Sequence, residues 1–198
     1  MKYINQRDYP HWLYITRTDM EGEDKEYGKT TTVKSSACGL CAAIMVADRL
    51  LVNYDFDLTA AIQLSYDQKA NYRAGTSYAR FAPAFAEKLG LKMEVTSDVE
   101  EMRRCIRTGG AAVALVIERK GERVGLFTHS AHYISVIDEE ADGRFVILDP
   151  SFTDTKFEEE GRKGKVEIKN GVIILCDAAT LDAEADPNNP PYYLFWRK

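Results

Sequence analysis

The sequence contains no long apolar run. No stretch approaches the ~20 consecutive apolar residues that a membrane-spanning helix requires. The first eight residues carry only scattered apolar side chains and lack the apolar core of a secretory signal. The chain as written is therefore expected to be a soluble cytoplasmic protein with no membrane partner, although a leader trimmed from a longer precursor would leave the same sequence.

Positive charge is also scarce. The 26 Lys and Arg residues are outnumbered by 31 Asp and Glu residues, which gives a net charge of −5, and the basic residues are scattered among acidic ones. Nucleic-acid-binding surfaces gather basic residues in a patch or stripe, so we expect no nucleic-acid partner. Four cysteines in 198 residues are too few for a disulfide-stapled scaffold. No internal repeat or low-complexity segment is present.

The chain nevertheless has enough apolar material for one sizeable core. Apolar residues make up 45% of the 198 residues and aromatic residues 11%, which favours a single domain over 1–198. Helical periodicity comes first and strand-like runs follow, so we predict an α+β fold with a helical lobe at about 37–108 and an antiparallel sheet lobe at about 111–198. Helices are expected at 35–51, 58–66, 77–89, 97–106 and 178–185, with Asp57 as the N-cap of the second and a capping box opened by Ser97 in the fourth. Strands are expected at 111–117, 133–138, 144–149, 165–168, 172–175 and 192–196, and a surface loop or short exposed hairpin at 18–34.

The stretch 35–51 begins with small polar residues and continues almost entirely apolar. This pattern predicts a helix that starts at a site and is then buried in the core. Ser35 or Ser36 is expected to cap the first turn, which places Cys38 within that turn. Unpaired backbone N–H groups and the positive end of the helix dipole favour a thiolate at this position. Cys38 is therefore the first candidate for a reactive nucleophile.

A cysteine nucleophile needs a base within hydrogen-bond reach, and the base needs an acceptor that orients it. The chain has only three histidines, and one of them, His132, immediately precedes a strand run. The partner strand ends in Asp149. A hairpin that turns over 139–143 brings Asp149 back beside His132. The chain order Cys38, His132, Asp149 therefore yields a feasible catalytic triad.

The segment Ala-Cys-Gly-Leu at 37–40, His132 before a hydrophobic strand, and Asp149 followed by proline resemble the bacteriocin-processing (double-glycine) peptidase-like branch of the papain-like cysteine peptidases. In that family a Cys opens the central helix, His and Asp or Asn stand on the sheet lobe, and an upstream Gln contributes to the oxyanion hole. The resemblance covers the layout of the chain and implies a papain-like fold. It implies a nucleophile, a base, an orienting acceptor and an oxyanion donor at Cys38, His132, Asp149 and Gln6.

Two features depart from the pattern of that family. Leu40 and Cys41 follow Gly39, where members usually read proline and then a small residue. Gln6 also lies farther upstream of Cys38 than the family's Gln does. Either residues 16–34 are an insertion, or Gln6 is not the equivalent residue.

The resemblance and the residue chemistry imply the same reaction, which is thiol-dependent hydrolysis of a peptide or amide substrate through a thioester. Resolution of the thioester by water gives a peptidase or amidase, whereas resolution by an amine gives an acyltransferase. We expect no cofactor and no metal. The identity of the substrate and the oligomeric state are left open by the sequence.

Three other interpretations use the same residues. Cys38 and Cys41 form a Cys-x-x-Cys pair of the redox type, although that motif belongs after a strand in a βαβ unit. Together with His129 and His132 the pair offers four zinc ligands, although structural zinc sites usually space their histidines slightly wider. The third is a non-catalytic binding module on the same fold. The remaining cysteines are expected to be inert core residues: Cys41, Cys105 and Cys176.

Overall fold

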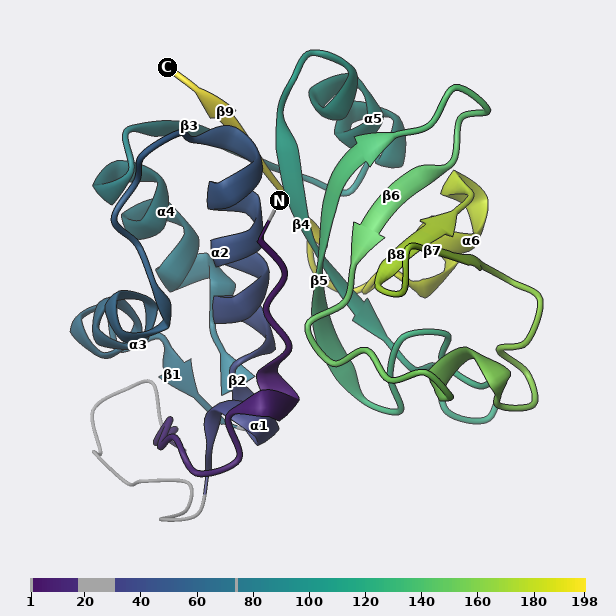
Figure 1. Cartoon of the computed structure of the whole chain (residues 1–198), viewed down its shortest axis with the longest axis horizontal. Coiled ribbons are helices and arrows are strands. Elements are labelled where there is room, and N and C mark those ends of the chain that lie inside the picture. Colours follow the sequence, from purple (N-terminus) through teal and green to yellow (C-terminus); the bar gives the residue numbers. More distant parts are fainter. Residues whose placement is uncertain (1, 18–30, 74) are drawn as a thin grey trace.

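The computed structural model describes residues 2–17, 31–73 and 75–198. Its main feature is a seven-stranded sheet in which every neighbouring pair of strands is antiparallel (Figure 1). Across the sheet the order is β3 (Leu91–Thr96), β9 (Tyr192–Arg197), β4 (Ala111–Ile117), β5 (Ala131–Glu139), β6 (Phe145–Leu148), β8 (Ile173–Cys176) and β7 (Glu167–Lys169).

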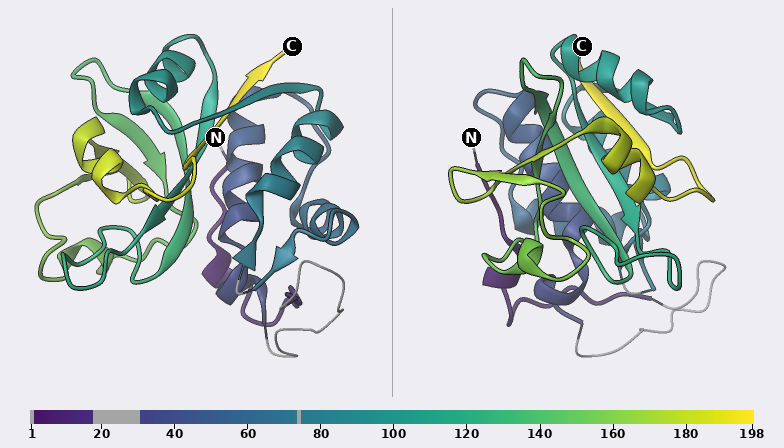
Figure 2. Two further views of the ribbon diagram at one scale, coloured as in Figure 1. Left: turned by 180° about the vertical axis from the view of Figure 1, so that it is seen from behind. Right: turned by 90° about the vertical axis from the view of Figure 1, so that its right-hand side faces the viewer.

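Helices cover both faces of this sheet. One face packs against α2 (Cys38–Leu50) and α4 (Tyr78–Lys88), with α3 (Leu58–Asp67) outside them, and the other face packs against α5 (Val99–Arg107) and α6 (Ala178–Glu184) (Figures 1 and 2). The smaller elements are η1 (Gln6–Asp8), α1 (Val33–Ser36), η2 (Lys156–Glu158) and a two-stranded ribbon of β1 (Asn71–Tyr72) and β2 (Gly75–Thr76). The α+β class that the sequence predicts is confirmed.

The alternation of side chains along β4 divides the core into two layers. Ala111 and Val113 join the cluster around α2, while Ala112, Ala114 and Val116 join the cluster around α5 and α6. Successive residues of a strand point to opposite faces, so a strand that is covered on both sides reads as an unbroken apolar run. The same reasoning applies to α2, which is apolar on all sides and buries ten of its residues.

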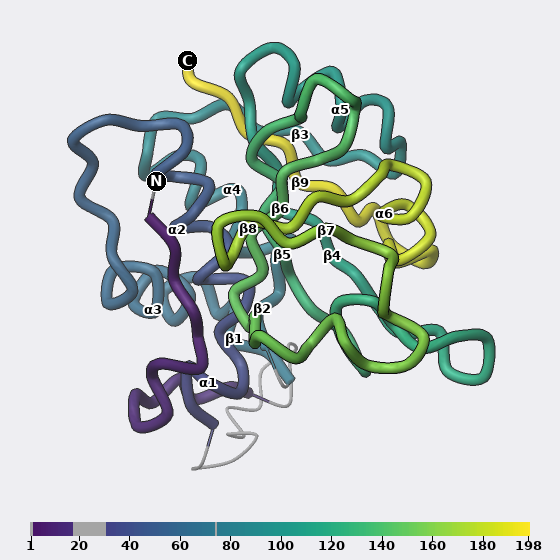
Figure 3. The backbone as a smooth tube through the Cα atoms, turned by 45° about the vertical axis from the view of Figure 1, so that its right-hand side comes forward, coloured from purple at the N-terminus to yellow at the C-terminus, as the bar shows by residue number. Residues whose placement is uncertain are grey.

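The hairpin of β5 and β6 determines which residues meet at its open end. Ser135 pairs with Leu148 and Val136 with Ile147, and the register shifts between Val136 and Asp138. The residue that follows β6 therefore returns toward the beginning of β5. The N-terminal segment approaches the same place, since it runs beside α2 from Lys2, whose backbone N–H donates to Asp48, down to η1 (Figure 3).

Several local expectations need correction. Ser35 and Ser36 are the last residues of α1 rather than caps of α2, whose N-cap is Ala37 without a side-chain hydrogen bond. The N-cap of α5 is Asp98, whose carboxylate accepts from the N–H of Glu100, rather than the preceding serine. Cys38 still occupies the first turn of its helix, because the chain bends sharply between α1 and α2.

Strand β3 and the ribbon of β1 and β2 are absent from the sequence-based expectations, and β3 lies within the range assigned to the helical lobe. Asp57 caps α3 through the N–H of Ala60, as predicted. Most of the loop expected between residues 18 and 34 lies outside the described residues. Among the described residues, no helix is long and apolar enough to cross a membrane.

Candidate active site

Cys38 is the first residue of α2 and remains partly exposed. The residue after it must be small, because a Cβ on Gly39 would lie 3.1 Å from ring carbons of both Tyr133 and Tyr78. The Tyr78 hydroxyl also donates to the Gly39 carbonyl at 3.2 Å, and the Tyr78 ring stacks on that of Tyr133 at 4.6 Å. Glycine at this position therefore lets the start of α2 lie directly against β5 beside His132.

The middle of the same interface is fixed by a polar contact. Ser135, on β5, is fully buried and its hydroxyl donates to the carbonyl of Ala42 at 3.0 Å. This bond ties the helix to the strand one turn beyond Cys38. The relative placement of Cys38 and His132 thus rests on ring packing at one point and a buried hydrogen bond at another.

His132 is the second residue of β5 and is buried. Its Nε2 lies 2.7 Å from Oδ1 of Asp149, which is completely buried just after the end of β6. His132 also interacts with the side chain of Cys38, and each of the two groups shifts the pKa of the other. The structure therefore brings three of the four predicted site residues together around His132.

The electrostatics around His132 favour a negatively charged Cys38 and a positively charged His132. Burial disfavours the thiolate of Cys38, but the hydrogen bond and the charge of His132, with backbone hydrogen bonds from Tyr133 and Gly39, outweigh it and lower the pKa of the thiol. Burial lowers the pKa of His132, but the charge and hydrogen bond of Asp149, followed by those of Cys38, raise it to about 9. A thiolate beside an imidazolium is the form that these shifts favour near neutral pH.

Asp149 has a second cationic partner that the sequence analysis missed. Nζ of Lys156, on η2, lies 2.5 Å from Oδ2 of Asp149, and the Lys156 side chain is only 9% exposed. Burial opposes ionisation of Asp149, but His132 and then Lys156 hold the pKa of the carboxyl well below its usual range. Burial also lowers the pKa of Lys156.

Ser151 completes the surroundings of this carboxylate. Its backbone N–H donates to Oδ1 of Asp149 at 2.7 Å, and its hydroxyl lies 3.2 Å from both that oxygen and Nε2 of His132. The hydroxyl also accepts from Lys156 at 2.9 Å. An aspartate followed two residues later by a serine is a turn signal visible in the sequence, whereas nothing in the sequence distinguishes Lys156 from an ordinary surface lysine.

Gln6 lies close to this group. It is buried in η1, its backbone N–H donates to the carbonyl of Pro150 at 2.7 Å, and its side-chain Nε2 donates to the carbonyl of Lys34 at 2.7 Å. Oε1 of Gln6 is buried and has no hydrogen-bond partner in the part of the chain that the structure describes. Gln6 thus packs between the turn that carries Asp149 and the helix that precedes Cys38.

The other cysteines and histidines have different environments. Burial raises the pKa of Cys105 and of Cys176 to about 12, and raises that of Cys41 as well. All four thiols are free. His129 is exposed and bonds to Glu118 and Glu159, away from the cysteines. Within the described ranges, no group of three or more His, Cys, Asp or Glu side chains is arranged to hold a metal ion.

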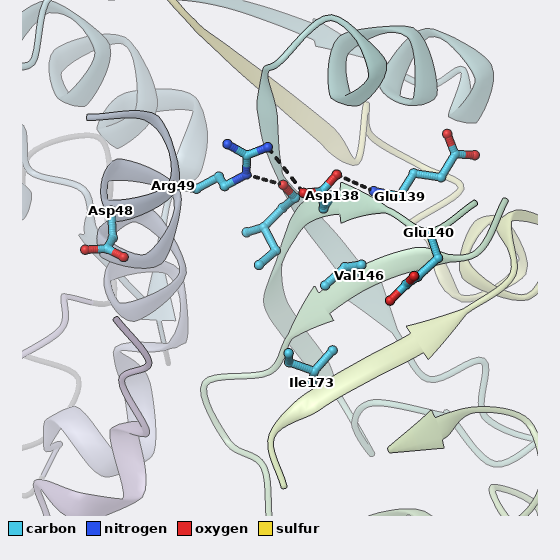
Figure 4. Close-up of a pocket in the computed structure, with 8 residues that line it drawn as sticks. Asp48, Arg49, Asp138, Glu139, Glu140, Val146 and Ile173 are labelled. Atoms are coloured by element: carbon cyan, nitrogen blue, oxygen red, sulfur yellow. Dashed lines mark hydrogen bonds and ion pairs between the residues drawn. The ribbon is translucent and has the colours of Figure 1, made fainter. Parts of the chain in front are cut away.

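A pocket of about 530 Å³ lies at the opposite end of the contact between α2 and β5 (Figure 4). It is lined by Asp48 and Arg49 from α2, by Asp138 to Glu140 from the end of β5 and just beyond it, and by apolar side chains of β6 and β8. Figure 4 shows the Arg49 guanidinium reaching across to Asp138, an ion pair of 3.3 Å. No predicted site residue borders this pocket.

Comparisons with known proteins bear on the fold. No family model and no curated protein sequence matches the chain. Its structure is similar to the crystal structure of a candidate C39-like peptidase from Bacillus anthracis, with a TM-score of 0.55 and 8% identical residues, over 100% of this chain and 94% of that one. At such low identity the likeness shows the fold alone.

Proposed function

We propose that this protein is a thiol-dependent hydrolase, a cysteine peptidase or amidase. Cys38 acts as nucleophile, His132 as general base and acid, Asp149 as the acceptor that orients His132, and Gln6 as an oxyanion donor. The observation that carries the proposal is the buried hydrogen bond between His132 and Asp149 next to Cys38, whose thiol has a lowered pKa while the pKa values of the other three cysteines are raised.

The first half of the reaction acylates the enzyme. The Cys38 thiolate attacks the carbonyl carbon of the substrate and forms a C–S bond, and the resulting oxyanion accepts hydrogen bonds from the Cys38 backbone N–H and from Gln6. Nε2 of Gln6 carries two hydrogens, of which the Lys34 carbonyl accepts one. The imidazolium of His132 donates its proton to the leaving nitrogen as the C–N bond breaks, which leaves a thioester on Cys38.

The second half regenerates the thiolate. Neutral His132 takes a proton from water, whose oxygen attacks the thioester carbon, and the C–S bond breaks to release the carboxylic acid. Asp149 keeps the ring of His132 in one orientation and stabilises the imidazolium in both halves. An amine in place of this water would give an acyltransferase with the same residues. The fold shared with a candidate C39-like peptidase supports a peptide substrate.

Alkylation by iodoacetamide near neutral pH tests the reactive thiol directly. We expect Cys38 to be modified much faster than Cys105, because only Cys38 combines partial exposure with a lowered pKa. Hydrolysis of a mixed peptide library by the wild-type protein and by Cys38→Ala tests the activity. Equal alkylation of both cysteines, together with hydrolysis that survives in Cys38→Ala, would leave the fold as a non-catalytic binding module or a different enzyme.

A further inference from the structure

A second pocket, of about 380 Å³, borders the far side of the triad carboxylate. Three segments line it: η1, the segment before β5, and the turn and η2 that follow β6. Ser151 is on its wall, and the hydroxyl of Ser151 lies 3.2 Å from Nε2 of His132. The lining side chains used below are Arg7, Ser151, Thr153, Thr155, Lys156, Glu159 and Arg162.

The charges around this pocket do not balance. Arg7, Lys156 and Arg162 are cations, and Asp149 neutralises Lys156 from outside the pocket. The one carboxylate in the lining, Glu159, lies 3.2 Å from Arg162 and also bonds to His129. Burial is the largest cause of the lowered pKa of Lys156, and the interaction with Asp149 opposes it. The positive charges of Arg162 and Arg7 lower this pKa further. The lining therefore carries an excess of positive charge.

Arg162 shows this imbalance most clearly. Its side chain is 4% exposed, and its Nη1 contacts Glu159 and the Lys156 carbonyl. Nε and Nη2 are buried, and neither has an acceptor among the described residues. Buried donors without an acceptor are costly and rare in folded proteins. Arg7 is exposed, and no acceptor contacts its guanidinium in the described part of the chain.

We propose that this pocket binds a carboxylate group of the substrate. The planar guanidinium groups of Arg7 and Arg162 match a carboxylate, which accepts two parallel hydrogen bonds. Hydroxyl groups of Thr153 and Thr155 add neutral donors. The proposal rests on the proposed function, because it makes the pocket a determinant of which peptides reach Cys38.

Ser151 on the pocket wall lies 3.2 Å from the imidazole of His132, which also interacts with Cys38. We infer that a peptide bound at Cys38 reaches the pocket within roughly two to three extended residues, at ~3.3–3.6 Å per residue. The carboxylate is either the end of a peptide chain or an Asp or Glu side chain at that distance. Both sources present the same group to the arginines.

Binding to the full-length Cys38→Ala protein tests the proposal without requiring catalysis. Three capped dipeptides serve as probes: acetyl-Ala-Glu-amide with a side-chain carboxylate, acetyl-Ala-Gln with a terminal carboxylate, and neutral acetyl-Ala-Gln-amide. Dissociation constants are measured by NMR titration at low salt. We expect one of the acids to bind at least about tenfold more tightly than the neutral probe, since the acid adds charge-assisted hydrogen bonds. The acid that is preferred identifies the source of the carboxylate.

Charge variants connect this preference to the pocket. Arg7→Met, which changes an exposed side chain, and Arg162→Met are expected to remove the preference, and Glu159→Gln is expected to increase it. Arg49→Met removes the same charge from the distant pocket of Figure 4 and should leave the preference unchanged.

Equal binding of all three probes, a preference that survives in Arg7→Met, or tighter binding of inorganic phosphate than of either acid would overturn the proposal. None of these outcomes depends on whether Cys38 is a nucleophile, which the alkylation experiment decides separately.

Discussion

The two ends of the contact between α2 and β5 carry opposite kinds of polar structure. At the end where α2 begins, His132 and Asp149 are paired with side chains 7% and 0% exposed. At the end where α2 finishes, Arg49 and Asp138 are paired with side chains 34% and 54% exposed. The larger of the two pockets lies at the exposed end. In this molecule the proposed chemistry therefore lies where charged side chains are buried and paired, and not where the pocket volume is larger.

Of these predictions, removal of the proposed base should have the largest effect, and it should lower activity only when the change is at the end where α2 begins. His132→Ala is expected to lower kcat/KM by roughly 10²–10⁴-fold, because no other group near Cys38 transfers a proton. Arg49→Met, at the other end, is expected to leave kcat/KM unchanged. Comparable losses in the two variants, measured on the same peptide substrate, would mean that the buried end has no special role.

Substitution of Lys156 tests whether the protein is most stable when the buried charges around Asp149 sum to zero. Thiolate, imidazolium, carboxylate and ammonium sum to zero, so Lys156→Met leaves one negative charge in excess. We expect it to reduce the free energy of unfolding by about 3–5 kcal/mol, whereas Arg49→Met should cost ~1 kcal/mol or less. The double variant Lys156→Met/Asp149→Asn should recover most of the loss in urea unfolding. A double variant no more stable than Lys156→Met alone would show that packing, not charge, explains Lys156.

The pH dependence of stability sharpens the same comparison. Above pH ~6.5 the unfolded chain has lost the His132 proton, whereas the folded protein keeps it up to a pKa of about 9, so the contribution of His132 to stability falls as pH rises through this window. The lowered pKa of Cys38 acts in the opposite sense, because the folded protein loses the thiol proton at lower pH than the unfolded chain does, and it offsets part of that fall.

Cys38→Ala removes the compensating thiol. Its folded form then binds one proton more than the unfolded chain above pH ~6.5, so its stability should fall by up to about 1.4 kcal/mol per pH unit until the pair of His132 and Asp149 loses its proton. Urea unfolding at several pH values measures both curves. If the two curves keep a constant separation from pH 6.5 to 8.5, Cys38 and His132 are not an ion pair.

Tyr78→Phe should have the smallest effect. It keeps the ring that packs on Gly39 and Tyr133 but removes the buried hydrogen bond to the Gly39 carbonyl, so we expect a loss of about 1 kcal/mol in the free energy of unfolding. Tyr54→Phe is the matched control at the other end, where the hydroxyl makes a long 3.4 Å bond to Asp48. A larger loss in Tyr54→Phe than in Tyr78→Phe would contradict the contrast between the two ends.

Most of the fold could be predicted because the apolar periodicity of most helices and strands matches the side on which they are buried. The helix α2 and the strands β4, β5 and β6 were all expected near their observed positions. Strand β3 was missed although its sequence alternates Leu91, Met93 and Val95 with polar residues, which is the pattern of a strand with one apolar face.

Only those residues of the candidate site that strand geometry places could be predicted from the sequence. The hairpin register brings His132 and Asp149 together, and this could be inferred from two apolar runs and a turn. Lys156 could not be inferred, because the segment that folds back over Asp149 has no regular periodicity and a lysine within it resembles solvated surface. The catalytic roles of all four residues stay predictions.

The central claim is that Cys38 is held as a thiolate by His132. The most direct test is the rate at which iodoacetamide alkylates Cys38 as a function of pH, in the wild-type protein and in His132→Ala. The account predicts that the wild-type rate stays high well below the ordinary cysteine pKa of about 8.5, and that His132→Ala shifts the whole profile to higher pH. A wild-type profile that rises only near the ordinary cysteine pKa, unchanged in His132→Ala, would contradict it.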